Sequence, residues 1–329
     1  MRIVGLGGGI GAARLWQALL RRVDPAEVTI VVNTGDDLWI HGLRVCPDLD
    51  TVLYALTDRQ DPVRGWGLRD ETWRCMAALR SLGGPAWFNL GDTDLATHLY
   101  RTGALRTGRT LSQVTADLSA KLGLRARLLP MTDEEVETHV LTDAGEFHYE
   151  EFYIPRGATD VVRSVEYRGA ERARPAPGIL EAVAAADLVV LGPSNPLASI
   201  GPILAVPGMR AAVAATTATV VGVTPIVSGT PITDPGEGRR AASRAALLAG
   251  AGLPHTATSA ARLLCDVLDV FVLDTADAQE TEAIAATGSR VVPADTLLTR
   301  PGHAEDLVDV VLDAGARGVA TAHRAEGDR

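Results

Sequence analysis

The sequence lacks any apolar run approaching the roughly 20 residues that a membrane helix requires, and it has few cysteines and lysines. Its three cysteines, Cys46, Cys75 and Cys265, lie far apart without a CxxC pair, which argues against a structural zinc and favours a reducing compartment. Lys121 is the only lysine, so no glycine-rich loop has a P-loop or Schiff-base lysine beside it. No export signal precedes the first apolar run. We therefore expect a cytoplasmic protein that does not interact with membranes.

The charge balance also excludes a class of partner. The formal net charge is -10 at pH 7, and nucleic acids attract basic surfaces, so we expect no nucleic-acid partner. Any ligand that carries phosphate must be bound by local features instead. The length of 329 residues fits one large α/β domain with an insertion, or two domains.

Short apolar runs alternate with amphipathic segments along most of the chain, which is typical of an α/β fold. The run 2–6 ends in a glycine cluster, a helical pattern follows, and the run 28–32 completes a first βαβ unit. We predict a Rossmann-like, doubly wound and mostly parallel sheet. Further expected strands are 86–90, 188–191, 219–223, 270–273 and 290–292, and further expected helices are 51–56, 71–82, 179–186, 238–250 and 304–314.

The pattern changes near residue 125 to short alternating segments, including 138–142 and 146–152, joined by a turn at 143–145. This indicates a small antiparallel β insert at 125–178, with Pro175 and Pro177 in the linker that leaves it. The Rossmann-like nucleotide-binding domain then comprises 1–124 and 179–318. The charged tail 319–329 is expected to be disordered.

The segment GLGGGIGAAR (5–14) places a glycine cluster between the first strand and the first helix. Glycines allow a sharp turn that brings backbone amides and a helix N-terminus close to a phosphate. Gly7, Gly9 and Ala12 satisfy a loose G-x-G-x-x-A pattern. The alternative is a tight turn without a ligand. NAD is not favoured, because Asn33 follows the second strand where a dehydrogenase places an acidic residue.

Four carboxylates follow the second strand in NTGDDLWIHGLRVCPDLDTVLY (33–54): Asp36, Asp37, Asp48 and Asp50. A doubly wound sheet places its ligand crevice at this edge. Carboxylates beside a phosphate suit Mg²⁺, which takes few protein ligands and keeps places for phosphate oxygens and water. The alternative is that Asp50 caps a helix starting near Thr51 and that Asp36 and Asp37 are solvated turn residues.

Two later turns carry polar side chains at expected strand ends. In WFNLGDTDLATHLYRTG (87–103), Asn89, Asp92 and Asp94 surround a glycine turn, and we expect one of the two aspartates to cap the next helix. In LVVLGPSNPLASIGPIL (188–204), a buried strand breaks into a turn whose amides, Ser194 hydroxyl and Asn195 amide suit a phosphate or a base edge. A purely structural turn is the alternative there.

Taken in order, these segments resemble the 2-phospho-L-lactate transferase family, called CofD, or FbiA in actinobacteria. The resemblance covers most of the chain. It rests on GGGIGAAR, NTGDDLWIHGLRVCPDLDTVLY, RGWGLRDETW (64–73), WFNLGDTDLATHL, LSQVT (111–115), LLPMTDEEVETHV (128–140) and LGPSNPLASIGPIL.

The resemblance implies transfer of phosphoenolpyruvate or 2-phospho-L-lactate from a guanosine-diphosphate-activated donor to the deazaflavin Fo, in coenzyme F-420 biosynthesis. GMP is released, Mg²⁺ is required, and a homodimer is expected. The absence of a nucleophile triad is consistent with this chemistry, which needs mainly alignment and charge neutralisation. The implied residues are Asp36 and Asp50 for catalysis, Asp36 and Asp37 for the metal, Asp50, Asn89 and Asp92 for Fo, and Gly7, Gly8, Gly9, Gly11, Gly192, Ser194 and Asn195 for the nucleotide.

One alternative function comes from a related family, the YvcK-type gluconeogenesis factors, which shares the glycine turn and a loop with two aspartates. A member of that family would bind a nucleotide sugar without turnover. The segment WIHGLRVCPDLDT belongs to the transferase pattern and favours the enzyme. Between the two cargoes, an actinobacterial-like composition favours the enolpyruvyl group.

Overall fold

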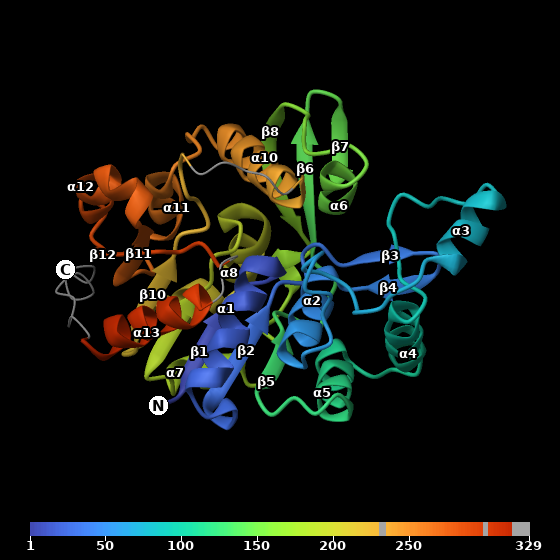
Figure 1. The fold of residues 1–329 in the computed structure, drawn as a ribbon, viewed down its shortest axis with the longest axis horizontal. Coiled ribbons are helices and arrows are strands. Elements are labelled where there is room, and N and C mark those ends of the chain that lie inside the picture. The colour runs from blue at the N-terminus through green and yellow to red at the C-terminus, as the bar shows by residue number, and fades with distance from the viewer. Residues whose placement is uncertain (230–234, 299–301, 318–329) are drawn as a thin grey trace.

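A computed structural model describes residues 1–229, 235–298 and 302–317, and a seven-stranded sheet forms its centre (Figure 1). Its strand order is β12-β11-β10-β9-β1-β2-β5, and every neighbouring pair is parallel. The strands are β1 (Ile3–Leu6), β2 (Val28–Val32), β5 (Arg127–Pro130), β9 (Leu188–Leu191), β10 (Thr219–Val223), β11 (Val270–Asp274) and β12 (Arg290–Ala294). The prediction of a doubly wound, mostly parallel sheet is confirmed.

The strand order reverses between β1 and β9. The chain adds β2 and β5 on one side of β1, then returns to place β9 on its other side and continues outward to β12. Ile3–Leu6 pairs with both Val28–Val31 and Leu188–Leu191. In sheets of this kind the ligand crevice lies outside the carboxyl ends of the strands at the reversal point. The loops after β1 and β9 are therefore where a ligand is expected.

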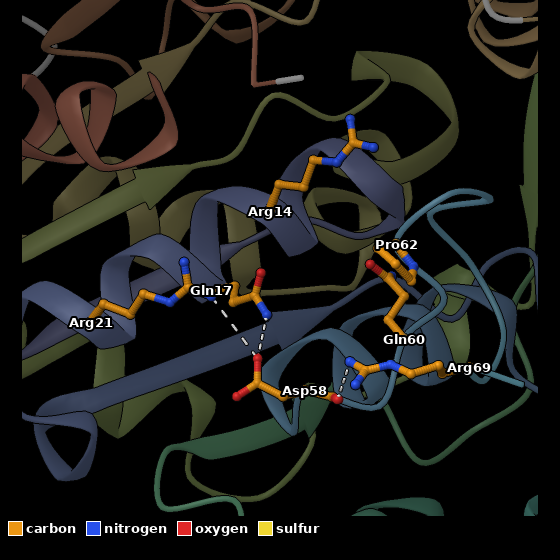
Figure 2. A pocket seen from close by; sticks show the side chains of 7 residues that line it. All are labelled: Arg14, Gln17, Arg21, Asp58, Gln60, Pro62 and Arg69. Atoms are coloured by element: carbon orange, nitrogen blue, oxygen red, sulfur yellow. Dashed lines mark hydrogen bonds and ion pairs between the residues drawn. The ribbon is translucent and has the colours of Figure 1, made fainter. Parts of the chain in front are cut away.

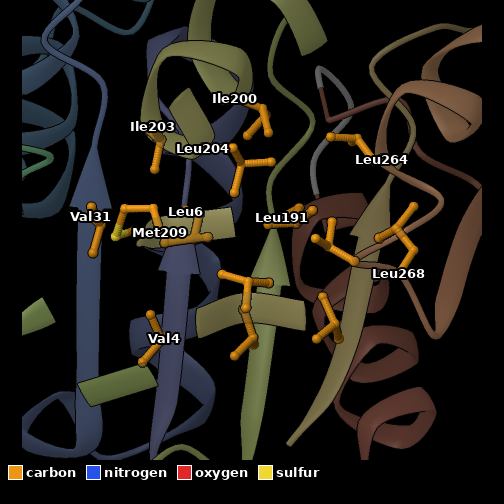
Figure 3. Close-up of a cluster of buried hydrophobic side chains, with 14 of the residues drawn as sticks. Val4, Leu6, Val31, Leu191, Ile200, Ile203, Leu204, Met209, Leu264 and Leu268 are labelled. Atoms are coloured by element: carbon orange, nitrogen blue, oxygen red, sulfur yellow. The ribbon is translucent and has the colours of Figure 1, made fainter. Parts of the chain in front are cut away.

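Helices cover both faces of the sheet, each over its own apolar core. One face packs against α1 (Gly9–Arg22), α2 (Pro47–Leu56), α5 (Leu111–Lys121) and α13 (His303–Ala316). The other packs against α7 (Ile179–Ala184), α8 (Gly201–Ala205), α9 (Met209–Ala215) and α11 (Ala257–Leu264). In Figure 3, Val4, Leu6 and Leu191 of the strands meet Ile203 and Met209 of these helices. Alternate strand residues bury on opposite faces, as expected for strands covered on both sides.

Trp16 of α1 packs where glycines leave space in and beside the central strands. The indole is fully buried, and a Cβ built on Gly5 would lie 2.9 Å from its Cη2. A Cβ on Gly192, which follows β9, would lie 2.9 Å from Cζ2 of the same ring. Glycine at both positions therefore allows α1 to approach the two strands that flank the reversal point.

The insert forms a three-stranded antiparallel sheet that stands at the top of Figure 1. Its elements are β6 (Glu137–Thr142), β7 (Gly145–His148), α6 (Tyr149–Tyr153) and β8 (Val162–Arg168). The predicted boundary at residue 125 is wrong, because β5 pairs with β2 in the main sheet. Leu128 and Leu129 bury in the cores on opposite faces, which makes β5 a strand of the large domain. The insert packs through Val140 and Phe152 against Leu247 of α10 (Pro235–Gly250).

A smaller lobe contains the antiparallel pair β3 (Leu38–Ile40) and β4 (Leu43–Val45), with α3 (Arg74–Ser81) and α4 (Asp94–Arg106). The predicted strand at 86–90 is not formed. Leu90 instead joins a separate apolar cluster with Val45 and Met76, so its burial does not require a place in the sheet.

The remaining elements are short. They are α12 (Thr281–Ala285), a π-helical turn (Pro196–Ile200) and 3₁₀ turns at Pro25–Glu27, Ala170–Arg172 and Thr275–Glu280. The predicted disordered tail, 319–329, lies outside the described residues. The three cysteines are free thiols. Within the described ranges no single helix meets the length and hydropathy criteria for crossing a membrane, whereas Pro196–Ala205 and Met209–Ala215, bent by 90°, meet them as a pair.

Replacement of Gly5 tests the close approach of Trp16. Gly5→Ala should lower the free energy of unfolding by about 1–3 kcal/mol, because the added methyl group overpacks a filled core. Gly103→Ala in α4 is the matched control, since a Cβ there meets nothing within 4 Å; it should be neutral or stabilising by up to about 1 kcal/mol. Urea denaturation of both variants decides, and equal stabilities would contradict the packing described.

Candidate active site

The two turns predicted to bind a nucleotide lie against each other at the reversal point. Ser194 Oγ, after β9, donates a hydrogen bond to the Gly8 carbonyl oxygen at 2.9 Å. A Cβ on Gly11 would lie 2.7 Å from the Pro193 carbonyl oxygen. Gly9 has φ of +74°, a conformation that side chains disfavour. The structure thus brings the glycine turn and the Gly192–Asn195 turn together.

Asn195 has a structural role in addition to any contact with a ligand. Its Oδ1 accepts hydrogen bonds from the backbone amides of Leu197 at 3.0 Å and Ala198 at 3.2 Å. These bonds cap the π-helical turn Pro196–Ile200. Since the carbonyl oxygen already accepts two hydrogen bonds, the Asn195 amide group is the part that remains suited to a ligand.

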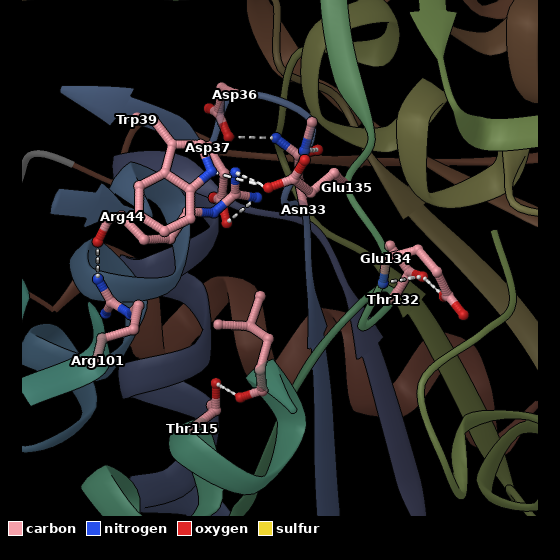
Figure 4. A network of polar contacts seen from close by, with 12 residues as sticks. Asn33, Asp36, Asp37, Trp39, Arg44, Arg101, Thr115, Thr132, Glu134 and Glu135 are labelled. Carbon is pink, nitrogen blue, oxygen red and sulfur yellow. Dashed lines mark hydrogen bonds and ion pairs between the residues drawn. The ribbon is translucent and has the colours of Figure 1, made fainter. Parts of the chain in front are cut away.

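Asn33, immediately after β2, joins two carboxylates. Its Nδ2 donates to Asp36 Oδ1 at 2.9 Å and to Asp48 Oδ2 at 3.0 Å, and Figure 4 shows the first of these bonds. The Asn33 Oδ1 accepts from the Gly35 amide at 2.8 Å, which fixes the orientation of the carboxamide. All three side chains are buried. The structure therefore pairs Asp36 with Asp48.

Asp48 also reaches both turns. It accepts hydrogen bonds from the Gly9 backbone and from Ser199 in the π-helical turn. A Cβ on Gly8 would collide with its carboxylate. Burial raises the pKa of Asp48 to about 6, although the hydrogen bonds from Asn33 and Ser199 act in the opposite direction. This carboxylate thus lies at the entrance to α1, where a phosphate was expected to bind.

Glu150, from α6 of the insert, supplies a third buried carboxylate. Burial first, and then the charges of Asp48 and Asp37, raise its pKa to about 8. Burial and the charges of Asp48, Glu150 and Asp37 raise the pKa of Asp36 well above its usual range. Burial is the largest cause of all three raised pKa values, and neighbouring carboxylates add to it for Asp36 and Glu150. Asp36 and Asp48, which share the Asn33 amide group, offer oxygen ligands of the kind that Mg²⁺ prefers.

Asp37 faces a different partner from Asp36. Its Oδ2 accepts a hydrogen bond from Arg44 Nη2 at 3.3 Å, and both side chains are buried. Burial raises the pKa of Asp37 to about 7, against the lowering effect of Arg44. Arg44 also stacks 5.9 Å from the centre of the Trp39 ring, and Glu135 accepts from Trp39 Nε1 at 2.8 Å (Figure 4). The two adjacent aspartates predicted as metal ligands therefore have different hydrogen-bond partners, Asn33 for Asp36 and Arg44 for Asp37.

Asp50 belongs to a buried ion pair. Its carboxylate binds the guanidinium of Arg101 through both oxygens, and α2 begins at Pro47, so Asp50 is inside the helix and does not cap it. His98 lies 3.6 Å from Asp50 and 3.2 Å from Asp94, which accepts from Tyr54 Oη at 2.6 Å. Asp50, Asp94 and His98 are close enough to hold a metal ion, but Arg101 already neutralises Asp50.

Asp92 organises the loop that also carries Asn89. Asp92 accepts hydrogen bonds from Thr72 Oγ1 at 2.5 Å and from the amides of Arg74 at 3.0 Å and Cys75 at 2.9 Å. The hydrogen bond from Thr72 is the largest cause of its lowered pKa. Asp92 therefore caps the start of α3, whereas the expectation was that Asp92 or Asp94 caps the helix that carries His98 and Arg101; that helix, α4, has no side-chain cap. Asn89 is half-buried on the same loop.

A separate polar pocket of about 310 Å³ lies on the flank of α1 (Figure 2). Asp58 accepts from Gln17 Nε2 at 2.8 Å, and Arg69 donates to the Asp58 carbonyl oxygen at 2.7 Å. Its lining contains none of the buried carboxylates. The lining residues are Arg14, Gln17, Arg21, Asp58, Gln60, Pro62 and Arg69.

Sequence reasoning included Asp48 among four carboxylates suited to Mg²⁺ but gave it no role of its own, and it assigned no role to Asn33 or Glu150. Asp48 and Asp50 are two residues apart on a helix, so their side chains leave it in different directions. The Asp48 side chain faces the glycine turn and the Asp50 side chain faces Arg101. Knowing that the helix begins at Pro47 would have made this division predictable. No pattern in the sequence indicates that Glu150 is buried.

The buried carboxylates give the metal-free protein a distinctive pH dependence. In the folded state the pKa values of Asp48 and Glu150 are about 6 and about 8, above the roughly 4 expected in an unfolded chain. Between about pH 4 and pH 8 the folded state therefore binds more protons than the unfolded state. The contribution of these two carboxyl groups to the free energy of unfolding is complete below about pH 4 and is lost as the pH rises toward 8. Urea denaturation in a chelator at pH 5, 6.5 and 8 should show this fall. If the free energy of unfolding of Glu150→Gln fell by the same amount over this pH range, Glu150 would not be a source of the pH dependence.

The variant Asp50→Ala distinguishes between two roles of Asp50, as a partner in a buried ion pair and as a helix cap. Loss of one partner of a buried pair should lower the free energy of unfolding by about 3–5 kcal/mol, whereas loss of a cap costs about 1 kcal/mol. Asp309→Ala, which removes an exposed pair with Arg22 at 3.0 Å, should cost less than about 1 kcal/mol. Chemical denaturation of both variants measures the difference. Similar losses in the free energy of unfolding would show that the buried ion pair stabilises the fold no more than the exposed one.

Comparisons with known proteins agree with the fold and with the family resemblance. A family model described as 2-phospho-L-lactate transferase CofD matches residues 3–312. A phosphoenolpyruvate transferase of Kitasatospora aureofaciens is 46% identical over 89% of this chain and 92% of its own. Another, of Streptomyces griseus subsp. griseus, is 44% identical over 91% of this chain and 93% of its own.

Among solved structures, a UPF0052-family protein of Bacillus halodurans has a similar fold, with a TM-score of 0.62 at 18% identity over 94% of this chain and 98% of that one. That likeness concerns the fold alone. The family match, at residues 3–312, spans the whole sheet and both turns at the reversal point. The chain belongs to the 2-phospho-L-lactate transferase (CofD) family and is a transferase.

Proposed function

We propose that this protein transfers the phosphoenolpyruvate moiety from a guanosine-diphosphate-activated donor to a hydroxyl group of the deazaflavin Fo, with release of GMP, in coenzyme F-420 biosynthesis. The observation that carries the proposal is the convergence of Asp36 and Asp48 on Asn33, beside two turns suited to a diphosphate. Relatives named phosphoenolpyruvate transferase, at 46% and 44% identity, support the enolpyruvyl cargo.

The residues suit a reaction in which alignment and charge neutralisation dominate. We assign the diphosphate to the glycine turn and to the Gly192–Asn195 turn, where backbone amides and a helix N-terminus are available. Asp36 and Asp48 would hold Mg²⁺, which neutralises negative charge on the diphosphate when bound. Asn33 orients both carboxylates through one amide group. Hydrogen bonds from Asn33 and Ser199 favour the charged form of Asp48.

For the acceptor, we assign the deazaflavin to the lobe that contains β3, β4 and Asn89. Two indoles are accessible for this role: Trp39 in β3 is 47% exposed, and Trp66, in the segment between α2 and α3, is 38% exposed. Flat aromatic side chains offer stacking surfaces for a planar ring system. Arg64 lies 5.5 Å from the centre of the Trp66 ring and 5.2 Å from that of Trp73, which stiffens this surface. Asp50, held by Arg101, would act on the acceptor side by fixing the position of α2.

A reconstituted reaction tests the function directly. The purified protein is mixed with Mg²⁺, Fo and the enolpyruvyl guanosine-diphosphate donor, and the products are followed by liquid chromatography and mass spectrometry. We expect GMP and the enolpyruvyl-phosphate ester of Fo to appear together, and more slowly with the lactyl donor. Tight binding of a nucleotide sugar with no Fo-dependent turnover would instead support the non-catalytic alternative.

Comparison of Asp36→Asn with Asp37→Asn tests the pairing of the carboxylates. Asp36→Asn should lower kcat by about 10²–10³, the loss typical of one transition-state contact, and should raise the Mg²⁺ concentration needed for half-maximal rate. Asp37→Asn should keep kcat within about tenfold, because Asp37 pairs with Arg44. Steady-state kinetics of both variants at varied Mg²⁺ concentrations measure kcat and the Mg²⁺ requirement. A larger loss of kcat in Asp37→Asn than in Asp36→Asn would indicate that Asp37, and not Asp36, binds the metal.

A further inference from the structure

We propose that His98 is a positioning residue: as a neutral imidazole it accepts a hydrogen bond from Arg101 and so fixes the Asp50–Arg101 pair that holds α2. The inference deepens the proposed function and rests on it for the identity of the acceptor. The observation behind it is a buried polar seam between α2 and α4, formed by Asp50, Tyr54, Asp94, His98 and Arg101.

The seam follows the spacing of the two helices. Asp94, His98 and Arg101 recur every three or four residues, as do Asp50 and Tyr54, so each set lies along one face of its helix. All five side chains are buried, with His98 1% and Arg101 2% exposed. Faces that helices bury are ordinarily apolar, and a buried polar group is costly unless it is paired. The polar atoms of the seam therefore need specific partners.

Each carboxylate of the seam faces donors. Both oxygens of Asp50 accept from the Arg101 guanidinium. Asp94 Oδ1 accepts from Tyr54 Oη at 2.6 Å, and Asp94 Oδ2 lies 3.2 Å from His98 Nε2. His98 is the link between these two groups, because its other ring nitrogen, Nδ1, lies 3.3 Å from Arg101 Nη1. The side chains thus form a continuous chain of contacts from Tyr54 to Asp50.

The distances assign the proton of the His98 ring. A guanidinium group can only donate, so the contact with Arg101 is favourable only if Nδ1 accepts. Nδ1 lies 3.6 Å from Asp50 Oδ2, which is too long for the hydrogen bond that an imidazolium would donate there. The proton therefore lies on Nε2, where it faces Asp94, and the ring is neutral.

The Arg101 guanidinium ties the smaller lobe to the helix that carries Asp48. Its Nη1 faces three acceptors: the Asp50 carboxylate, His98 Nδ1 and, at 3.3 Å, the Arg44 carbonyl oxygen of β4 (Figure 4). These acceptors come from α2, α4 and β4, and together they fix the rotation of the guanidinium. On the same helix as Asp50, Asp48 faces the glycine turn.

This connection gives His98 a role in the reaction without contact with substrate. The smaller lobe is assigned to the acceptor, and the glycine turn to the diphosphate. Alignment of the two substrates dominates a reaction of this kind, and small displacements of the reacting groups are costly. Loss of the acceptor that His98 offers to Arg101 would loosen the attachment of α4 to α2 and disturb that alignment.

Two substitutions each keep one half of the His98 contacts. His98→Asn places a carbonyl oxygen near the position of Nδ1 and retains an acceptor for Arg101. His98→Gln places an amide group near the position of Nε2 and retains a donor for Asp94. Gln is closer to His in size, so a residue that only fills space would be replaced better by Gln. Leu99→Asn is the matched control, because Leu99 is the next residue of α4 and is 60% exposed.

Steady-state kinetics with Fo and the enolpyruvyl donor provide the functional readout, after thermal melts have shown that the variants fold. His98→Gln should raise KM for Fo at least about tenfold and lower kcat by about ten- to a hundredfold, with KM for the donor within about threefold of the wild type. His98→Asn should lie closer to the wild type in KM for Fo and in kcat, and Leu99→Asn should match it. Function of folded His98→Gln equal to or better than that of folded His98→Asn overturns the proposal.

Nitrogen NMR of the wild type provides a readout that requires no turnover and decides if a variant does not fold. In metal-free protein with ¹⁵N-labelled histidines at about pH 7.5, couplings between ring protons and ring nitrogens show which nitrogen is protonated. The His98 ring is assigned by correlation to its backbone. We expect a neutral ring with the proton on Nε2. An imidazolium, or a neutral ring with the proton on Nδ1, overturns the proposal, because Nδ1 could then not accept from Arg101.

The two readouts separate this inference from the proposed function. If the wild type forms no Fo-dependent product, the proposed reaction fails, while the protonation of the His98 ring still tests the contact with Arg101. If the wild type forms the product and folded His98→Gln matches it in KM for Fo and in kcat, the reaction stands and His98 is not a positioning residue.

Discussion

One carboxamide holds the functional centre together. Asn33 lies at the end of β2, and its single amide group contacts both Asp36 and Asp48 while its oxygen is held by the Gly35 backbone. Two buried carboxylates would repel each other without such a donor between them. Because Asp48 also accepts from Gly9 and Ser199, this arrangement connects β2, the start of α1 and the turn after β9. The geometry of the candidate site thus depends on the placement of one side chain.

The large domain was predictable because its signals are local. Continuous apolar runs gave the bounds of β9 and β10 as the structure has them, and glycine clusters correctly indicated the turns after β1 and β9. The segment 86–90 has the same apolar character but packs in the smaller lobe. An apolar run predicts burial, and the choice between a sheet and a separate cluster depends on contacts that are distant in the sequence.

Which residues gather at the candidate site could be predicted from the sequence, but which of them contact each other could be predicted less well. The acidic segment 33–54 and both turns come together as expected, yet Asp36 and Asp37, which are adjacent, face Asn33 and Arg44 respectively. Asp50 is bound by Arg101, which is 51 residues later in the chain. Which carboxylate meets a cation and which meets an arginine is decided by tertiary packing. Glu150 is the extreme case, because its burial depends on how the insert folds onto the large domain.

The indole of Trp16 touches positions in or beside both central strands, near Gly5 of β1 and Gly192 after β9. These are the strands that lead into the two proposed phosphate-binding turns, while the ring itself belongs to the apolar core beneath α1. It therefore acts as a spacer that fixes how closely α1 approaches these two strands. If a diphosphate binds these turns as proposed, substitutions in this core would alter its fit by changing the separation of the two turns, without contacting it.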